Sequence, residues 1–336
     1  GIFAGHFHGN MTALHALLET AIATNDNGLK QMIREAYDHA RRKGIGRMGW
    51  VPGWLRPTEH HRDADLFVWS ETCGVADTLV LAVKLSDAGL GDYWDDVDAI
   101  VRNHLVAQQI TDLDQMRTLG GGDPQKDALL KRMVGSFNQS MEGWINSTGP
   151  HAFGCCSANG AVGLYYAWHG ITRFDEKSKT ATVNLLLNRA SAWMDIDSYL
   201  PYEGKVVLRN KQAKSAMVRL PYWAERGNVK CFVDEQAVEP AMSGNHLLFT
   251  DLRPQDGKKA GSELRLEFPV PLTTEKHTVG GREHTLTFRG STLVDITPRD
   301  TSPNRYQYYL RQGMMEKKAP MHEVKRFVAD TVIGLQ

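Results

Sequence analysis

The sequence lacks the features that mark a membrane or nucleic-acid-binding protein. Its 336 residues contain no apolar run close to the roughly 20 residues that a helix needs to cross a bilayer. The 39 basic residues balance the 39 acidic residues, so the formal net charge is zero. A balanced charge gives no electrostatic footprint for nucleic acid or for an anionic membrane. We therefore expect a soluble protein without either partner, long enough for one large domain or two ordinary ones.

The N-terminus also lacks an initiator Met and a basic-then-apolar targeting segment. Its first residues, GIFAGHFHGN, lead directly into a helical pattern, which indicates that the chain begins inside a domain. A signal peptide lost with an upstream part would leave the compartment open. The localisation is therefore unassigned, with the cytoplasm slightly favoured by the free thiols.

Cysteine is scarce. The chain has four, Cys73, Cys155, Cys156 and Cys231, too few for a disulfide framework at this length. A disulfide between the neighbours Cys155 and Cys156 would be strained. Buried free thiols and metal ligands are the two remaining interpretations, and Cys231, in an alternating apolar stretch, is most simply a core thiol.

The first half of the sequence has helical periodicity. Apolar residues recur at helical spacing near 10–24, 29–43, 75–83, 97–105, 124–137 and 161–168. The interval 50–69 carries Pro52, Gly53 and Pro57, which break a helix, and we expect a long functional loop there. About six helices in antiparallel-looking hairpins predict the C-terminal half of an α/α toroid. An upstream segment or a partner chain is expected to supply the missing half.

The second half changes to an alternating pattern from about Ala181. Short apolar stretches such as ATVNLLL, KVVLRN, NVKCFVD and SELRLEFPV are separated by turn residues, which is typical of an antiparallel β-sandwich. Thr172 to Lys179 is predicted to be a polar linker. The expected fold is therefore an α + β multidomain protein. Its predicted domains are 1–172, with the helices and the site, and 180–336, the sandwich with a C-terminal extension.

Two short motifs offer metal-ligating side chains. SETCG supplies Glu71 and Cys73, and GCCSANG supplies Cys155 and Cys156, which are donor types that Zn²⁺ binds. Residues two apart point to the same side of an extended segment but to opposite sides of a helix. For both Glu71 and Cys73 to bind one metal, we expect the first motif to be extended or just entering its helix. The second motif is predicted in the turn before its helix, where Gly154 permits unusual dihedrals and free amides lower a thiol pKa. This spacing differs from the paired C-x-x-C of zinc fingers.

Longer motifs give the chain a family resemblance. They are GHFHG opening a helix, SETCGVADTLVLAVKL, GDYWDDVDAIVRN, GCCSANGAVGLYYAW and, in the second half, YLPYEGKVVL and VRLPYWA. With these motifs the chain resembles glycoside hydrolase family 127 and its relatives, of the β-L-arabinofuranosidase type. The resemblance implies an α/α toroid followed by a β-sandwich. It also implies a zinc ion held by one glutamate and three cysteines, here Glu71, Cys73, Cys155 and Cys156.

The same resemblance implies a reaction. Cys155 matches the family's nucleophile, a thiolate that attacks the anomeric carbon and forms a thioglycosyl intermediate. A carboxylic acid then serves as acid and base, so that a terminal sugar such as β-L-arabinofuranose leaves with retained configuration. Glu59 is the candidate acid/base, with Asp63 and Asp65 as rivals.

Several residues are candidates for carbohydrate binding. His6 matches a substrate-contacting histidine of the family, and Asp98 lies where relatives place a sugar-binding acid. Three further candidates are the tryptophans Trp50, Trp54 and Trp69. Each is expected either to stack on a sugar face or to lie buried at a domain seam. His6, His8, His60 and His61 are further potential metal ligands, although histidines in a polar loop are more often substrate or solvent contacts.

Two other functions remain open at this point. A polysaccharide lyase or another carbohydrate enzyme can use the same architecture with His and Tyr instead of a thiolate. A non-catalytic, carbohydrate-associated protein is the second alternative, because four protein ligands also form a structural zinc site. The discriminating observation is whether Cys155 can be reached from a pocket lined by Glu59 and His6. Relatives close the sugar pocket with residues of the upstream toroid half, which this sequence lacks.

Overall fold

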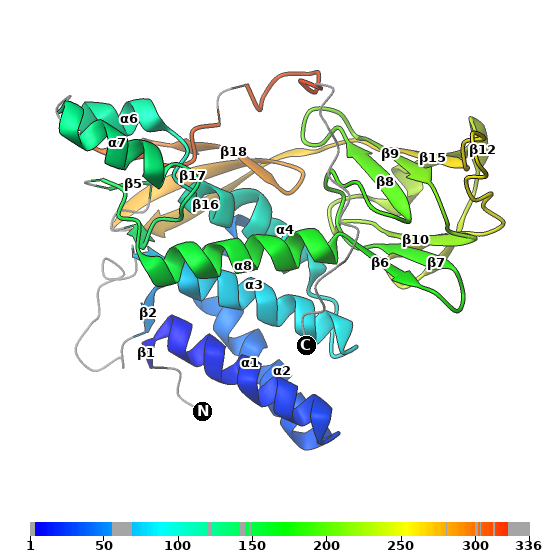
Figure 1. Cartoon of the computed structure of the whole chain (residues 1–336), viewed down its shortest axis with the longest axis horizontal. Helices are drawn as coiled ribbons and strands as arrows, with labels where there is room; N and C mark the ends of the chain where they lie inside the picture. The colour runs from blue at the N-terminus through cyan, green and yellow to red at the C-terminus, as the bar shows by residue number, and fades with distance from the viewer. Residues whose placement is uncertain are drawn as a thin grey trace. The chain divides into compact units, whose positions relative to one another are not determined.

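The protein mixes helices and strands (Figure 1). This computed structural model describes residues 4–55, 69–119, 123–141, 145–147, 149–279, 281–299, 302, 304–311 and 313–321. By its contacts the chain divides into two compact units. Unit 1 comprises Gly1–Ala167 with Thr273–Gln312, and unit 2 comprises Trp168–Leu272 with Gly313–Gln336.

Unit 1 contains most of the helices. They are α1 (Phe7–Ala23), α2 (Asn27–Ala40), α3 (Thr72–Asp87), α4 (Trp94–Ala99), α5 (Val106–Gln108), α6 (Leu113–Leu119), α7 (Pro124–Met133) and α8 (Gly154–Gly170), whose end reaches into unit 2. Two 3-10 helices, η1 (Arg41–Lys43) and η2 (Gly46–Met48), follow α2, and a π-helix, η4 (Ile100–Leu105), joins α4 to α5. The predicted helical segments are confirmed, whereas α6 was not predicted. None of the described helices has the length and hydropathy to cross a membrane.

Local sequence signals explain where these helices begin and end. The side chain of Asp26 caps α2 by accepting a hydrogen bond from the Leu29 amide at 2.9 Å. Asp123 caps α7 in the same way, and Pro124 fills the first turn of that helix. The helix α7 ends at Met133, earlier than the predicted 137, because Gly135 turns into the left-handed region with φ 90°.

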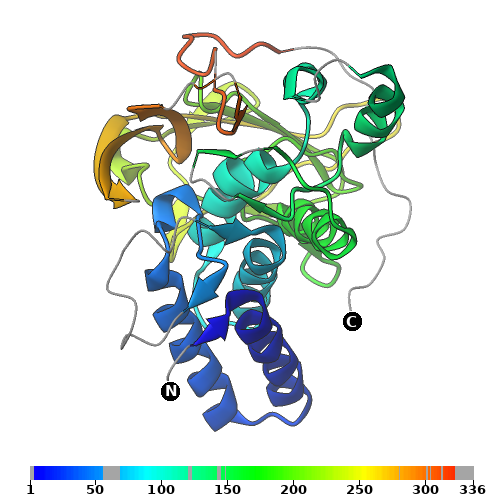
Figure 2. The ribbon, with the colours of Figure 1, turned by 90° about the vertical axis from the view of Figure 1, so that its left-hand side faces the viewer.

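The helix α3 is the central element of the helical layer. Figure 2 shows α1 and α2 side by side, and α1 contacts α3. On another side of α3, a Cβ at Gly163 of α8 would lie only 3.1 Å from the Cβ of Ala76. A Cβ there would be in tighter contact than most, so Gly163 lets the middle of α8 approach α3 closely.

Strands complete unit 1. Three short antiparallel pairs join β1 (Gly5–His6) to β2 (Trp54–Leu55), β3 (Ser70–Glu71) to β4 (Ser140–Met141), and β5 (Asn146–Ser147) to β19 (Tyr306–Gln307). A three-stranded sheet consists of β16 (Leu272–Val279), β17 (Arg282–Arg289) and β18 (Thr292–Thr297). Phe288 and Ile296 of this sheet share a buried core with Trp50. Residues 273–312 therefore belong to the same compact unit as the helices. The predicted domain 180–336 instead places them with the strands of the second half.

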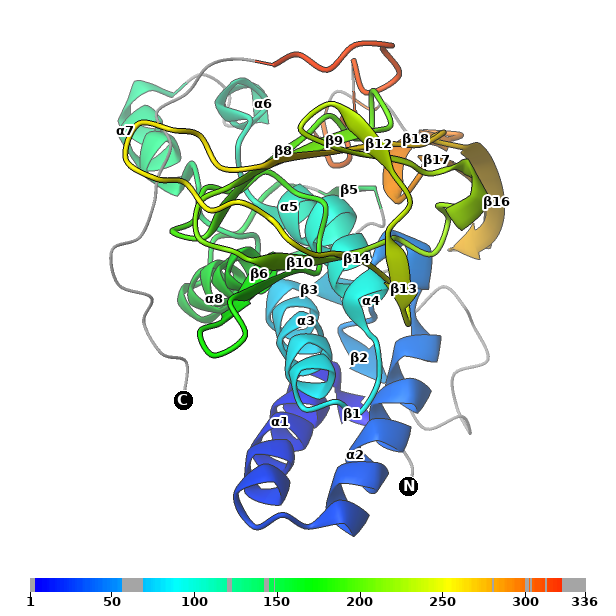
Figure 3. The same cartoon turned by 90° about the vertical axis from the view of Figure 1, so that its right-hand side faces the viewer.

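Unit 2 contains two five-stranded sheets in separate layers (Figure 3). One has the order β13 (Ala241–Ser243), β14 (His246–Phe249), β10 (Ser215–Arg219), β7 (Thr180–Val183) and β6 (Thr172–Asp175). The other has the order β12 (Gln236–Val238), β11 (Lys230–Val233), β15 (Glu263–Glu267), β9 (Lys205–Asn210) and β8 (Met194–Ser198). A short 3-10 helix, η5 (Arg226–Asn228), precedes β11.

Two details of unit 2 correct the sequence prediction. The predicted linker 172–179 is wrong, because Thr172–Asp175 forms β6 and pairs antiparallel with β7. In the polar turn after β6, Asp175 at the end of that strand accepts hydrogen bonds from the amides of Lys177 and Ser178. The first sheet is also not purely antiparallel, since β7 and β10 pair in parallel. Alternation within a strand carries no information on the direction of its neighbours.

Candidate metal-thiolate site

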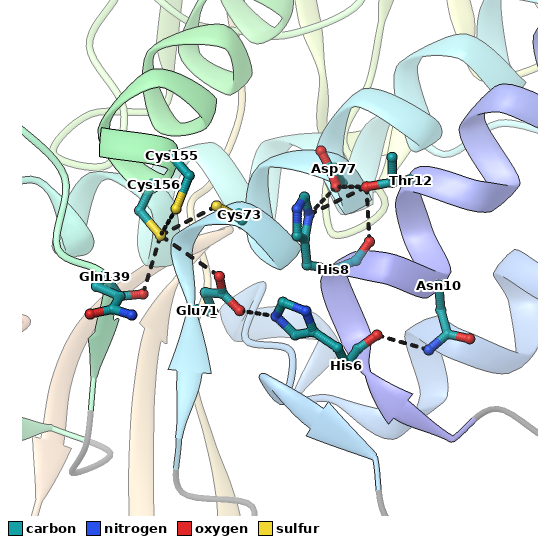
Figure 4. A network of polar contacts seen from close by, with 10 residues as sticks. All are labelled: His6, His8, Asn10, Thr12, Glu71, Cys73, Asp77, Gln139, Cys155 and Cys156. Atoms are coloured by element: carbon teal, nitrogen blue, oxygen red, sulfur yellow. Dashed lines mark hydrogen bonds and ion pairs between the residues drawn. The ribbon is translucent and has the colours of Figure 1, made fainter. Parts of the chain in front are cut away.

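Three cysteine thiols of unit 1 meet where α3 and α8 begin (Figure 4). The Sγ of Cys156 lies 3.3 Å from the Sγ of Cys73 and 3.7 Å from the Sγ of Cys155. Its distance to Oε1 of Glu71 is 3.8 Å. The structure therefore brings together all four predicted metal ligands, from two motifs 83 residues apart in sequence.

The first motif has the predicted local structure. Glu71 is extended, with φ −113° and ψ 133°, and it precedes the first helical residue of α3. Its side chain is therefore not used to cap the helix, and together with Cys73 in the first turn it faces the cluster. The strand β3, which carries Glu71, is fixed by pairing with β4.

The second motif differs from its prediction. Cys155 and Cys156 lie in the first turn of α8, which already begins at Gly154, and not in a turn before it. The amide of Ser157 donates to the carbonyl oxygen of Phe153 at 2.9 Å, so the helical hydrogen bonds include this segment from its start. The first turn of a helix presents neighbouring side chains at different angles. As a result Cys156 is buried, whereas Cys155 is exposed.

The distances and donor types fit a tetrahedral metal site. With Zn–S bonds of about 2.3 Å, two sulfur ligands of one tetrahedral zinc are separated by roughly 3.8 Å. The two S–S distances of 3.3 and 3.7 Å are close to this value. All three sulfurs lie within 4.8 Å of one another, and the Glu71 carboxylate supplies a fourth donor. Two of the three thiols are buried, which is the setting in which thiolate ligands hold a metal.

The buried thiols Cys73 and Cys156 titrate as a pair. A hydrogen bond from the Cys156 thiol stabilises the Cys73 thiolate and lowers the pKa of Cys73 to about 7, with help from the Asn159 side chain and against desolvation. The same bond, together with burial, raises the pKa of Cys156. The metal-free pair thus loses its first proton more readily than an isolated thiol does. Because a metal must displace the remaining protons, its affinity is expected to rise with pH.

Two predicted substrate-binding residues lie beside this cluster. The His6 ring contacts the Glu71 carboxylate through Nε2. Its other neighbour is Trp54, whose ring stacks on His6 with centroids 5.5 Å apart and planes 22° from parallel. The pairing of β1 with β2 places these two residues directly opposite each other. Trp54 is 45% exposed, so this stacked pair is open to a ligand from solvent.

The other predicted site residues have different positions. The candidate acid/base Glu59 and its rivals Asp63 and Asp65 lie outside the described residues. The same holds for His60 and His61. Asp98 is buried in α4 and pairs with Arg102 of the following turn at 2.8 Å. Two nitrogens of Arg102 donate to Oδ1 of this carboxylate, and the sugar-binding role of Asp98 stays a prediction.

The remaining tryptophans and Cys231 are buried or half-buried, and the sugar-stacking role of Trp50 and Trp69 stays a prediction. Trp50 is buried in the core of unit 1. Trp69 is half-buried, and its carbonyl oxygen accepts a hydrogen bond from the Gly53 amide at 2.8 Å. Cys231 is buried in β11 of unit 2, where burial raises its pKa to about 11, as expected for a core thiol.

A histidine–aspartate pair next to the cluster was not predicted. Nδ1 of His8 lies 2.5 Å from Oδ2 of Asp77, which also accepts a hydrogen bond from Thr12 at 2.7 Å. The rings of His8 and His6 are edge to face at 5.3 Å. The sequence marks His8 only as a possible ligand, and its partner Asp77 becomes visible only when α1 packs on α3 (Figure 4).

Solved structures share this fold. A GH127 β-L-arabinofuranosidase from Geobacillus stearothermophilus T6 superposes with a TM-score of 0.57 at 15% identity, covering 86% of this chain and 47% of the enzyme. A second GH127 β-arabinofuranosidase gives 0.60 at 16%, with coverage of 86% and 47%. This chain has the fold of these GH127 enzymes.

The likeness has a defined extent. A third structure, a glycoside hydrolase, matches with a TM-score of 0.60 at 14% identity and covers 86% of this chain and 51% of its own. The chain therefore spans about half the length of the structures that it matches. No family model matches the sequence, and no curated protein matches it. The likeness agrees with the resemblance predicted from the motifs, at the level of the fold.

Proposed function

We propose that this chain carries the thiolate centre of a retaining glycoside hydrolase, which releases a terminal sugar such as β-L-arabinofuranose. The observation that carries this proposal is the meeting of Glu71 with three cysteines, at the starts of α3 and α8, on a fold shared with GH127 enzymes. Neither the motif spacing nor the fold alone supports the reaction as well as the two together.

The proposal includes the finer architecture. The helices of unit 1 form part of an α/α toroid, and the two five-stranded sheets of unit 2 form a β-sandwich. The matched structures are about twice as long as this chain, which supports a further toroid half from an upstream segment or a partner chain. That half would help to close the carbohydrate pocket.

Glu71, Cys73, Cys155 and Cys156 are the residues that would hold Zn²⁺. When bound, zinc keeps thiol ligands deprotonated at neutral pH and so supplies a thiolate. Cys155 is the exposed member of the three cysteines, whereas Cys73 and Cys156 are buried. A sugar arriving from solvent can therefore reach the sulfur of Cys155. This difference in burial supports Cys155 as a ligand that also attacks the sugar, and Cys73 and Cys156 as ligands alone.

The reaction then proceeds in two displacements. The Cys155 sulfur forms a bond to the anomeric carbon while the bond to the leaving oxygen breaks and that oxygen takes a proton from a carboxylic acid. The resulting carboxylate removes a proton from water, whose oxygen attacks the same carbon and releases the thiolate. Two inversions give net retention. Glu59 is the proposed acid/base, with Asp63 and Asp65 as alternatives, and His6 with Trp54 is the proposed sugar-binding pair.

Covalent labelling tests this proposal. We expect an arabinofuranoside-derived electrophile to modify Cys155, as mapped by peptide mass spectrometry, and to leave the buried Cys231 unmodified as an internal control. A protein that holds stoichiometric zinc but is not labelled would favour the structural-zinc function. Carbohydrate cleavage that survives Cys155→Ser would favour an enzyme of the lyase type.

The histidine–aspartate pair gives a separate prediction for substrate binding. Asp77 orients the His8 ring, and among the described residues no partner of its Nε2 is seen. If Nε2 contacts a sugar hydroxyl, Asp77→Asn should raise KM about tenfold, the effect of one misplaced hydrogen bond, with a smaller change in kcat. Thr12→Ser keeps a hydroxyl that can bond Asp77 and is the matched control. Equal KM values for both variants would contradict the prediction.

A further inference from the structure

We propose that the adjacent tyrosines Tyr308 and Tyr309 are positioning residues for the thiolate cluster. Their hydroxyl groups hold, through His104 and Asn138, the two segments that carry the metal ligands. The inference rests on the proposed metal site and extends it to a part of unit 1 more than 150 residues further along the chain than Cys156. Each branch of this arrangement can be followed atom by atom.

The Tyr309 branch ends beside Glu71. The Tyr309 hydroxyl contacts Nδ1 of His104, and Nε2 of the same ring lies 2.8 Å from Oγ of Ser70. Ser70 directly precedes Glu71 in β3. All three side chains in this chain of bonds are buried. The branch therefore fixes the strand from which the carboxylate ligand projects.

The His104 ring has no spare bonding capacity in this arrangement. Burial lowers the pKa of His104 to about 3, so the ring is neutral at physiological pH. A neutral ring has one donor nitrogen and one acceptor nitrogen, and the two hydroxyls of Ser70 and Tyr309 use both. Loss of either hydroxyl leaves a buried nitrogen without its partner, which costs more than an average hydrogen bond.

The backbone of Tyr309 is itself unusual. Its φ is 53°, in the left-handed region that bulky residues rarely occupy. Arg299 donates to the carbonyl oxygens of Tyr308, at 3.1 Å, and of Tyr309, at 2.6 Å, which secures this conformation. A strained conformation persists where the surroundings determine it, and such sites often serve a function. Here the strain directs two successive tyrosines into two different hydrogen-bond chains.

The Tyr308 branch leads to a segment that contacts both Thr72 and Cys156. Its hydroxyl accepts a hydrogen bond from Nδ2 of Asn138 at 2.6 Å and lies 2.8 Å from Oγ of Ser147. The backbone oxygen of Asn138 accepts from the hydroxyl of Thr72, between Glu71 and Cys73, at 2.6 Å. The next carbonyl oxygen, of Gln139, lies 3.7 Å from Sγ of Cys156 (Figure 4). Tyr308 thus holds the segment that touches both ligand motifs.

A zinc-affinity measurement tests the proposal in the whole chain. We expect Tyr308→Phe and Tyr309→Phe to raise the zinc dissociation constant about ten- to a hundredfold, as loss of supporting hydrogen bonds does at other sites, measured by competition with a chromophoric chelator. Tyr306→Phe is the matched control, because this buried tyrosine lies in the same segment but bonds the backbone at Thr111 and Asp112. Unchanged affinity in the first two variants, or an equal loss in the control, would overturn the proposal.

A second measurement, the alkylation rate of the thiols, tests the positioning role of the tyrosines independently of the proposed zinc. In metal-free protein we expect Tyr309→Phe to increase the alkylation rate of Cys73 and Cys156 by N-ethylmaleimide several-fold, with buried Cys231 as the reference thiol. This faster alkylation is expected even if the wild-type chain binds no zinc. A chain without zinc would contradict the proposed cofactor but not the positioning role of the tyrosines. Ser70→Ala removes the same chain of bonds at its other end and replaces Tyr309→Phe if that variant does not fold. Wild-type alkylation rates in both variants would refute the positioning role.

Discussion

Replacement of Cys155 by serine is expected to lower the turnover of an arabinofuranoside by ~10⁴-fold or more while the fold survives. The serine hydroxyl has the same shape, but it is a far weaker nucleophile than a thiolate. Because Cys155 is exposed, the substitution leaves the packing of α8 on α3 intact. The measurement is kcat/KM for an aryl arabinofuranoside, with circular dichroism and zinc content as checks on the fold and the metal.

Controls make this result specific. Cys231→Ser removes a thiol of unit 2 and should leave turnover within about twofold of the wild type, because Cys231 is buried in β11, outside the unit that holds the cluster. A Cys155→Ser protein that retains zinc and loses activity assigns the chemistry to this sulfur. Retained activity in that variant would contradict the proposed mechanism whatever its zinc content.

Removal of zinc is expected to destabilise unit 1 strongly. A ligand that binds only the folded state at a thousand times its dissociation constant stabilises that state by about 4 kcal/mol. The ligands Glu71, Cys73 and Cys156 are buried and come from two distant motifs, so the metal would link the starts of α3 and α8. We expect a chelator to lower the melting temperature and to increase hydrogen exchange in the first turns of these helices.

The pH dependence and one substitution sharpen this second prediction. Hydrogen bonding lowers the pKa of Cys73 to about 7, so zinc must displace one more proton once the pH falls below 7. Zinc-dependent stability should therefore fall as the pH is lowered through 7. Cys73→Ser should remove most of the zinc-dependent stabilisation, whereas Cys231→Ser should preserve it. An identical melting temperature with and without chelator, at neutral pH, would exclude a tightly bound metal.

Burial distinguishes the two neighbouring cysteines of the cluster. The sequence presents Cys155 and Cys156 as equivalent neighbours, and only the family resemblance distinguishes them. In the structure the first turn of α8 directs Cys156 toward Cys73 and leaves Cys155 at the surface. The two neighbouring thiols thus differ in exposure because a helix turns about 100° per residue.

Some errors of the sequence prediction have one physical cause. The polar residues of 172–179 predict a linker, yet Thr172–Asp175 pairs with β7 and forms an edge strand of its sheet. The parallel pairing of β7 with β10 was likewise not visible. Pairing partners and strand directions depend on contacts between distant segments, which the periodicity of a single segment does not encode.

The sequence by itself determined the local features of this protein. Helical spacing gave the positions of α1, α2, α3 and α8, and the motifs SETCG and GCCSANG named the four residues that meet in the cluster. Such features depend on residues within a turn or two of each other. Only the tertiary structure decided which thiol is exposed, that Asp77 holds His8, and that Tyr308 and Tyr309 reach the ligand segments. These contacts join residues 60 or more positions apart, so they arise from packing and not from local pattern.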